Sequence, residues 1–440
     1  MRSGPLQQKS NEAGVRAVRI IITKKPMPKK SSIRTSELRG MVSLLTHATI
    51  QVTDMTEKAH HSIVQPTALP HTPIHRMIRG ISGLVFFSVK HISRFVGHGL
   101  DHILNLWRPH QETGISFAKK EEALAITNGI VGDYLQANHN PLATPMQIRY
   151  QDEPLSLHSI SLETYPKLNG HLLLMLHGLC MNDVQWNRKG HNHGDKLASE
   201  FNLTPLYLRY NSGLHISDNG RMLSEQMEKL ISKWPVPIES ITFLTHSMGG
   251  LVARSAIYYG QQDDKTWPNH INKMVFLGTP HFGAPLEKIG HHVHRLLEVH
   301  PYVKPFSRLG SVRSAGITDL RFGNVVEENW KGNDRFKNYA QKKFHIDLPE
   351  YVKCYAVAAC MGRRENLLNN HLLGDGLVPV ESALGRQKDS RYTLNFAKEN
   401  CKTVYQTKHL DLLNSDEVYQ SLRTWFSGQL SIGDQASGMI

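Results

Sequence analysis

The chain has 440 residues, of which 40% are hydrophobic, so it can bury the core of one large globular domain together with an accessory segment. Lysine and arginine exceed aspartate and glutamate by 13, yet residues 1–40 alone hold ten basic residues against Glu12 and Glu37. The rest of the chain carries only about +5. The high pI therefore describes a tail, and because no RNA- or DNA-binding motif accompanies it, we expect no nucleic-acid partner.

The cysteines and the hydropathy pattern favour a soluble, cytoplasmic protein. Four cysteines form no CxxC pair, which is typical of free thiols in a reducing compartment. No stretch approaches the ~20 consecutive apolar residues that a bilayer span needs. No apolar core follows the N-terminal charges, as it would in a secretory signal. A mitochondrial transit peptide is the alternative for this arginine-rich, acid-poor leader.

Residues 1–34 lack sustained periodicity and are predicted to be a disordered basic tail. A helical N-terminal extension is predicted over residues 35–137, because apolar residues recur at alternating steps of three and four. Its helices cover residues 38–59, residues 78–107 and the stretch "EEALAITNGIVGDYL". The helix over 78–107 has one continuous apolar face. That face packs on the main domain in one interpretation and makes a peripheral membrane contact in the other.

Residues 138–430 alternate short apolar runs with amphipathic ones, and residues 431–440 form a C-terminal tail. The predicted strands are "MQIRY", "HLLLML", "TPLYLRY", "SITFLTH", "KMVFLGT" and "KCYAVAA". Helices are predicted near residues 219–233, 249–260 and 416–427. Apolar strands that alternate with helices predict an α/β fold with a mostly parallel sheet, covered on both faces.

The stretch "ITFLTHSMGGLVARSA", residues 241–256, joins a β-like run to a helix-compatible run through an abrupt turn at Ser247. A nucleophile elbow requires this context, because the turn lifts the serine clear of the sheet edge. The helix N-terminus also directs N–H groups towards a developing oxyanion. Gly249 and Gly250 supply the small side chains that the turn needs, whereas Thr245 stands where the usual pentapeptide has glycine. On this motif alone, a helix-capping serine is the alternative.

An oxyanion hole needs a second N–H donor from the loop after an earlier strand. "LLLMLHGLCMND" supplies such a loop where an apolar strand runs into His177-Gly178-Leu179. Gly178 lets the backbone turn so that the Leu179 N–H points inward. The second expected donor is the Met248 N–H. Each of the two donors is expected to stabilise the transition state by about 3–4 kcal/mol. We expect His177 to shape this loop and not to take part in the chemistry.

An acid and a base are expected after the serine, in the chain order Ser, Asp, His. "HLLGDGLVPVESA" places Asp375 between two glycines, and "CKTVYQTKHLDLL" places His409 after a β-like run. A glycine-flanked aspartate is often only a turn residue, and one histidine among 26 is a weak signal. The three residues in the order Ser247, Asp375, His409 are a specific signal of a catalytic triad. In this triad, His409 takes the Ser247 proton, and Asp375 fixes the imidazole tautomer.

These motifs resemble the serine lipases and esterases of the α/β-hydrolase superfamily. "HSMGGLVARSA", "LHGL", "LGTPHFGAP", "DGLVPVESA" and "KHLDLL" are similar to blocks of bacterial triacylglycerol-lipase-like and GPI-inositol-deacylase-like hydrolases, and the resemblance covers roughly residues 115–430. It implies an α/β-hydrolase fold. The site residues that it implies are the triad Ser247, Asp375 and His409 and the oxyanion-hole residues Leu179 and Met248.

The same resemblance suggests how the pocket is built. His177, Gly178, His281 and Phe282 are expected to line it, and His281 is a less favoured second base because it precedes the aspartate. An excursion over about residues 285–350 resembles a cap or lid, with a helix packed on the surface as the alternative. No metal site is predicted, because the histidines of "GHHVHR" fan around a helix instead of sharing a face.

The sequence therefore predicts a serine hydrolase that cleaves carboxylic esters of a lipid-like small molecule through an acyl-Ser247 intermediate. No cofactor is implied. An acyltransferase and a thioesterase or amidase are alternatives, because the same triad serves them. A catalytically silent membrane or protein adaptor is a third alternative. The complete ordered triad disfavours it, since an adaptor has no need of all three roles.

Overall fold

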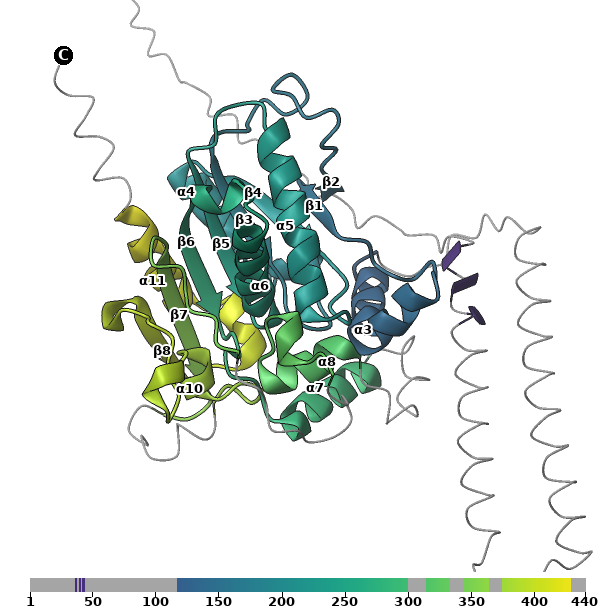
Figure 1. Cartoon of the computed structure of the whole chain (residues 1–440), viewed down its shortest axis with the longest axis vertical. Coiled ribbons are helices and arrows are strands. Elements are labelled where there is room, and N and C mark those ends of the chain that lie inside the picture. The colour runs from purple at the N-terminus through teal and green to yellow at the C-terminus, as the bar shows by residue number, and fades with distance from the viewer. Residues whose placement is uncertain are drawn as a thin grey trace, which may run out of the picture.

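A computed structural model describes the parts of the chain that form the α/β domain. The described residues are 36–37, 39–40, 42–43, 117–299, 314–332, 344–363 and 374–428. They contain an eight-stranded sheet with the strand order β2-β1-β4-β3-β5-β6-β7-β8 (Figure 1). The strands are β1 (Gln147–Tyr150), β2 (Glu153–Pro154), β3 (His171–Leu176), β4 (Thr204–Arg209), β5 (Ser240–His246), β6 (Ile271–Leu277), β7 (Lys353–Cys360) and β8 (Cys401–Tyr405). In this order, each pair of neighbouring strands from β4 to β8 is parallel. The β1 strand pairs antiparallel with both of its neighbours, β2 and β4.

Helices cover both faces of this sheet (Figure 1). The described helices of one turn or more are α3 (Phe117–Ala137), α4 (His193–Phe201), α5 (Ile216–Lys233), α6 (Met248–Gln262), α7 (Leu286–Val299), α8 (Ala315–Phe322), α10 (Val380–Ala383) and α11 (Asp416–Ser427). Side chains alternate along each strand. In β3, Leu172 and Leu174 join the core that contains α5 and α6, and Leu173 and Met175 join the core that contains α4 and α11. The central strands β3, β5, β6 and β7 are buried on both faces, which explains their largely apolar sequences.

The predicted α/β-hydrolase fold with a mostly parallel, doubly covered sheet is confirmed, and each of the six predicted strands is present. Both bounds of the strand predicted at "KMVFLGT" were wrong: β6 begins at Ile271, and it ends at Leu277 because Gly278 has a φ of +62° and leaves the extended conformation. α4 and α8 were not predicted. Both are short and begin at side-chain caps, where Asn192 accepts from the Gly194 and Asp195 N–H groups and Ser314 accepts from the Ile317 N–H.

α3 packs directly on the α/β domain, although the sequence analysis grouped it with the N-terminal extension. The Ser314 hydroxyl donates to the Gly129 carbonyl over 2.7 Å, and the Ala315 N–H donates to Asp133 Oδ2 over 3.0 Å. These bonds join α3 to α8, which lies in the excursion predicted as a cap. Lid motion of that excursion stays a prediction.

Several sequence predictions fall outside the described residues. These are the basic tail over 1–34, most of the helix over 38–59, the amphipathic helix over 78–107 and the tail over 431–440. Among the helices that are described, none is long and apolar enough to cross a membrane. The four cysteines, Cys180, Cys354, Cys360 and Cys401, are free thiols.

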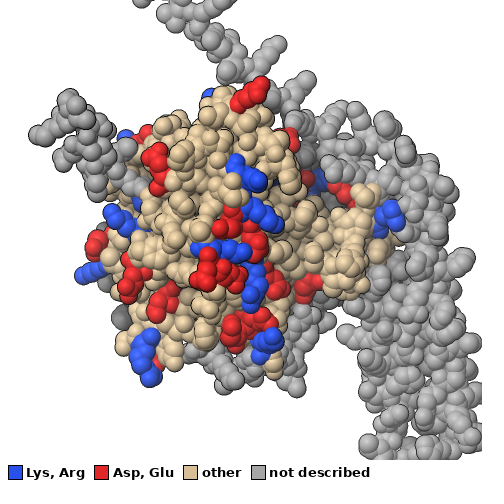
Figure 2. All heavy atoms as spheres, turned by 45° about the horizontal axis from the view of Figure 1, so that its top comes forward, with Lys and Arg blue, Asp and Glu red and all other residues tan. Residues whose placement is uncertain are grey.

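Charges of both signs are interleaved on the described surface. Figure 2 shows Lys and Arg side by side with Asp and Glu over one face of the domain. Pairs of opposite charge include Lys265 with Glu225 at 2.7 Å and Arg221 with Glu327 at 3.2 Å. This mixed face agrees with the location of much of the excess positive charge in residues 1–40.

Candidate active site

Ser247 stands at the sharp turn between β5 and α6. Its φ of 53° and ψ of −124° lie in a region that few residues other than glycine adopt. Such a backbone costs of order 1–3 kcal/mol and persists only where the surroundings fix it. Here the Ser247 N–H donates to the Leu277 carbonyl, at the end of β6, over 2.9 Å. The strand-turn-helix expected around Ser247 is therefore present.

Gly249 allows the first turn of α6 to lie against the end of β3. A Cβ at this position would lie 2.4 Å from the Leu176 carbonyl oxygen and 2.7 Å from that of His177. Both neighbours are backbone atoms, so a side chain would force the helix away from the strand. The small residue that the elbow needs on its helix side is thus a steric requirement of this chain.

Thr245 occupies the strand side of the elbow without leaving a polar group unsatisfied. It is fully buried, and its hydroxyl donates to the Val275 carbonyl of the neighbouring strand β6 over 3.0 Å. The side chain therefore ties β5 to β6 two residues before Ser247. This explains how a threonine is accommodated where a glycine is usual.

We expect Thr245→Gly to lower the free energy of unfolding by about 1–3 kcal/mol, because it removes this hydrogen bond and adds a flexible residue to a strand. Ester hydrolysis should change less than about tenfold, since the turn is held mainly by backbone contacts. Urea unfolding and kcat on a short ester measure the two effects. Thr245→Val, which keeps the shape, is the control. A large gain in kcat for Thr245→Gly would show instead that the threonine restrains the nucleophile.

Asp375 and His409 form a buried pair between the ends of β7 and β8. Asp375 Oδ2 accepts from His409 Nδ1 at 2.6 Å, while Oδ1 accepts from the N–H groups of Leu377 at 2.9 Å and Val378 at 2.7 Å. A carboxylate that faces Nδ1 keeps the proton there and leaves Nε2 as an acceptor. Nε2 is buried and has no hydrogen-bond partner among the described residues.

The end of β6 places the His409 ring beside the Ser247 turn. Leu277 accepts the Ser247 N–H, and the next residue, Gly278, lies directly against His409. A Cβ at Gly278 would be 3.2 Å from His409 Cε1 and 2.8 Å from Leu412 Cδ1. The structure therefore brings the predicted serine, aspartate and histidine to one edge of the sheet, at the carboxyl ends of parallel strands.

We expect Gly278→Ala to disturb this arrangement. Its φ of +62° disfavours any side chain, and the new methyl group would press on the His409 ring. Stability should fall by about 1–2 kcal/mol, and kcat by about 100-fold, because a displacement of roughly 1 Å is enough for such a loss. Gly290→Ala, where a Cβ meets nothing within 4 Å, is the matched control for both measurements. Equal kcat values for the two variants would contradict the placement.

His246 is a neighbour of the site that the sequence analysis missed. Its Nε2 donates to the His409 carbonyl over 3.2 Å, and the two ring centroids are 4.8 Å apart. Burial, and then the charge of His409, hold the pKa of His246 well below its usual range. A neutral ring here supports the His409 backbone without adding a second positive charge. The available signal was its position directly before Ser247.

The two predicted oxyanion donors, the amides of Leu179 and Met248, lie on segments that the structure brings together. Met248 begins α6, so helix geometry leaves its N–H without an intrahelical acceptor. A Cβ on Gly178 would lie 3.0 Å from the Cβ of Ser247, which places the loop carrying Leu179 next to the serine. Both Leu179 and Met248 are buried. Their use as donors stays a prediction.

His177 holds this loop in shape. Its Nδ1 donates to the Gly178 carbonyl over 2.9 Å, its Nε2 accepts from the Tyr210 N–H at 3.3 Å, and the His177 ring stacks on Tyr210 at 4.1 Å. The Tyr210 hydroxyl donates to the His177 carbonyl over 2.7 Å. Burial lowers the pKa of His177 to about 4, so the ring is neutral at ordinary pH. Both nitrogens are occupied, which agrees with a structural role.

Because four of its histidines are buried and neutral, we expect the free energy of unfolding to fall in acid. Burial lowers the pKa of His177 and His193 to about 4, and holds the pKa of His246 and His281 well below the usual range. The unfolded chain takes up these protons near pH 6.5 and the folded chain does not. These neutral histidines therefore make their full contribution to the free energy of unfolding above about pH 6.5. This contribution is lost as the pH falls towards about 4, by up to ~1.4 kcal/mol per pH unit for each histidine.

Urea unfolding at about pH 7 and about pH 5 measures this loss. His177→Gln should reduce the pH slope of the unfolding free energy by about one proton, because glutamine can accept the Tyr210 N–H without titrating. A stability that is the same at both pH values would contradict the prediction.

His281 and Phe282 line a pocket together with Arg254 of α6. His281 Nδ1 lies 3.3 Å from Arg254 Nη1, and the His281 N–H lies 3.2 Å from the Ser382 carbonyl. This arrangement gives no support to His281 as a second base, because its ring faces an arginine. Among the described residues, no group of three or more His, Cys, Asp or Glu side chains could hold a metal ion.

The sheet topology and the strand-turn-helix at Ser247 define the class of the domain, the α/β-hydrolases. Residues 167–347 match the family model described as "PGAP1-like alpha/beta domain". This part of the chain, which includes Ser247 and the loop of Leu179, is similar to that domain. No curated protein matches the chain.

Solved structures similar to the chain include lipases and esterases. The mature form of Bacillus licheniformis lipase BlEst2 is 14% identical, with 58% of this chain and 92% of that chain covered and a TM-score of 0.38. A lipase-esterase related protein from Clostridium acetobutylicum is 17% identical, with 59% and 95% covered and a TM-score of 0.33. The Pyrococcus furiosus esterase PF2001 is 18% identical, with 59% and 82% covered and a TM-score of 0.33. The function proposed below rests on the residues of this chain.

Proposed function

We propose that the protein is a serine hydrolase that cleaves carboxylic esters of lipid-like small molecules. The observation that carries the proposal is the buried His409–Asp375 pair beside the Ser247 turn. His409 Nδ1 donates to Asp375 over 2.6 Å, and His409 Nε2 has no hydrogen-bond partner among the described residues. A nitrogen in this state is ready to accept the proton of a nucleophilic hydroxyl.

The reaction follows from these positions. Ser247 Oγ attacks the ester carbonyl while His409 Nε2 takes its proton, and His409 then gives that proton to the departing alcohol. The amides of Leu179 and Met248 stabilise the oxyanion. Water, activated by the same histidine, hydrolyses the acyl-Ser247 ester. Asp375 keeps the imidazole in the required tautomer and balances its positive charge.

A panel of p-nitrophenyl esters of increasing acyl length tests this function. We expect turnover that is abolished in Ser247→Ala, with a maximum at one acyl length that reports the depth of the pocket. Matched thioester and amide substrates, and an added alcohol acceptor, assign the leaving group and the acceptor. If the folded protein turns over none of these substrates, the proposal fails and the adaptor alternative replaces it.

A further inference from the structure

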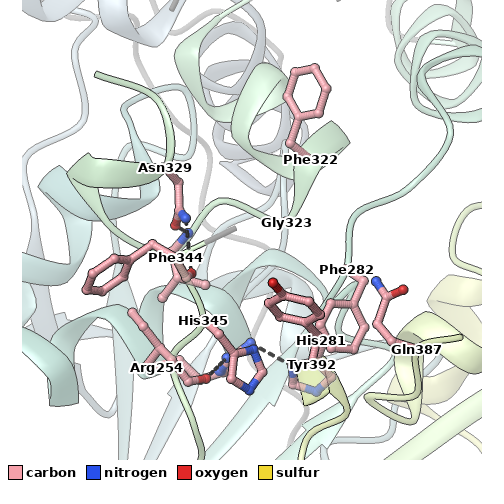
Figure 3. Close-up of a pocket in the computed structure, with 12 residues that line it drawn as sticks. Arg254, His281, Phe282, Phe322, Gly323, Asn329, Phe344, His345, Gln387 and Tyr392 are labelled. Atoms are coloured by element: carbon pink, nitrogen blue, oxygen red, sulfur yellow. Dashed lines mark hydrogen bonds between the residues drawn. The ribbon is translucent and has the colours of Figure 1, made fainter. Parts of the chain in front are cut away.

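The pocket that Arg254, His281 and Phe282 line lies beside α6. It has a volume of about 60 Å³ and lies among Arg254, His281, Phe282, His345, Gln387 and Tyr392 (Figure 3). Arg254 follows Ser247 by seven residues on α6, which is roughly 10 Å along the helix axis. His345 and Tyr392 pack edge to face at 5.7 Å and lie in front of the Arg254–His281 pair in Figure 3.

Arg254 is a buried cation without a carboxylate partner among the described residues. It is 5% exposed, its Nη2 donates to the Ile346 carbonyl over 2.5 Å, and its buried Nε has no hydrogen-bond partner in the described parts of the chain. The other buried arginine of the described residues, Arg149, is paired, since it contacts Asp183 at 2.8 Å. Burial lowers the pKa of Arg254 to about 10, so it remains charged at neutral pH. An uncompensated buried charge is costly, and an anion would offset that cost.

His281 adds a neutral donor next to this charge. Because its Nδ1 faces Arg254 Nη1 at 3.3 Å, Nδ1 is the acceptor and the proton sits on Nε2. That Nε2 is buried and has no partner among the described residues. Burial, and then the charge of Arg254, hold the pKa of His281 well below its usual range. Arg254 and His281 both line the pocket, and each thus holds one buried N–H group, Arg254 Nε and His281 Nε2, that lacks an acceptor among the described residues.

We propose that this pocket binds a phosphate group through Arg254 and His281, either as free phosphate or as the head group of a lipid. Phosphate offers only acceptors and negative charge, which complements both groups. Among the described residues, no aspartate or glutamate lines the pocket, and the Gln387 side chain lies at its wall. Its volume would hold roughly four water molecules, so it admits a tetrahedral oxyanion but not an acyl chain. The site is separate from the ester-cleaving site and does not depend on the proposed function.

Titration of the full chain with sodium phosphate, against sodium chloride at equal ionic strength, tests the site. We expect saturable heat on calorimetry and a rising Tm with phosphate alone, both of them retained in Ser247→Ala. Arg254→Met should bind at least tenfold more weakly, and His281→Phe, which keeps a ring against Phe276, should also bind more weakly. Arg423→Met is the matched control. It removes the same charge from α11, where Arg423 contacts Glu200, and should bind like the wild type.

Vesicles of phosphatidylcholine with and without phosphatidic acid identify the source of the phosphate. Binding that requires phosphatidic acid and Arg254 assigns a lipid head group, whereas binding of inorganic phosphate alone assigns a free ion. Either outcome supports the site. Should Arg254→Met unfold, the wild-type titration decides alone, because an absence of saturable binding to phosphate and to both vesicles overturns the proposal. Equal losses in Arg254→Met and Arg423→Met overturn it as well.

Discussion

Ser247→Ala is expected to lower kcat for ester hydrolysis by about 10⁶-fold, because it removes the nucleophile and leaves only oxyanion stabilisation and binding. The change deletes one oxygen at a turn whose backbone contacts remain, including the 2.9 Å bond to the Leu277 carbonyl. The fold should therefore persist. Initial rates on the best p-nitrophenyl ester, with enzyme concentrations raised for the variant, measure the loss, and circular dichroism checks the fold.

Ser255→Ala is the matched control for this variant. Ser255 is a buried serine on the same helix, α6, and its hydroxyl has no hydrogen-bond partner among the described residues. Its removal should leave kcat close to the wild-type value. A Ser247→Ala protein that keeps more than a few per cent of the activity would show that another nucleophile does the work.

Asp375→Asn is expected to lower kcat by about 10⁴-fold while the fold is kept. The asparagine oxygen can still accept from the N–H groups of Leu377 and Val378, so the loop should hold. Its amide would donate to His409 Nδ1, where Asp375 now accepts at 2.6 Å. The imidazole would then carry its proton on Nε2 and could no longer take the proton of Ser247.

Asp411→Asn provides the comparison for this substitution. Asp411 lies two residues after His409, but its carboxylate pairs with Arg188 at 3.3 Å in a partly exposed position. Loss of that pair should cost at most about 1 kcal/mol and should leave kcat nearly unchanged. Full activity in Asp375→Asn would assign the acid to another residue.

The central strands were predictable because each of them is buried on both faces. "HLLLML" and "SITFLTH" are continuous apolar runs, and the structure places neighbouring residues of these runs in opposite cores. The end of β6 was not predictable to the residue, since Gly278 leaves the strand through its own backbone conformation. α4 was missed because "HNHGDKLASEF" contains weak helix formers, and the Asn192 cap compensates for them.

The residues of the candidate site were predictable from their order along the chain, and their neighbours were not. Ser247, Asp375 and His409 stand in short motifs, and the parallel sheet brings its carboxyl ends to one edge. His246, Arg254 and Gly278 act through tertiary contacts with residues far along the chain. Arg254, for example, faces His281 and Ile346 from a helix that is buried along most of its length. Local sequence patterns do not predict such tertiary contacts.

Labelling of the full chain with a fluorophosphonate probe, followed by peptide mapping, tests whether Ser247 is an activated nucleophile. The probe reacts only with a serine that an adjacent base activates. We expect a single adduct on Ser247 that is absent in Ser247→Ala and forms far more slowly in His409→Ala. A folded wild-type protein that takes up no label, or that carries the label on another residue, would show that Ser247 is not the nucleophile.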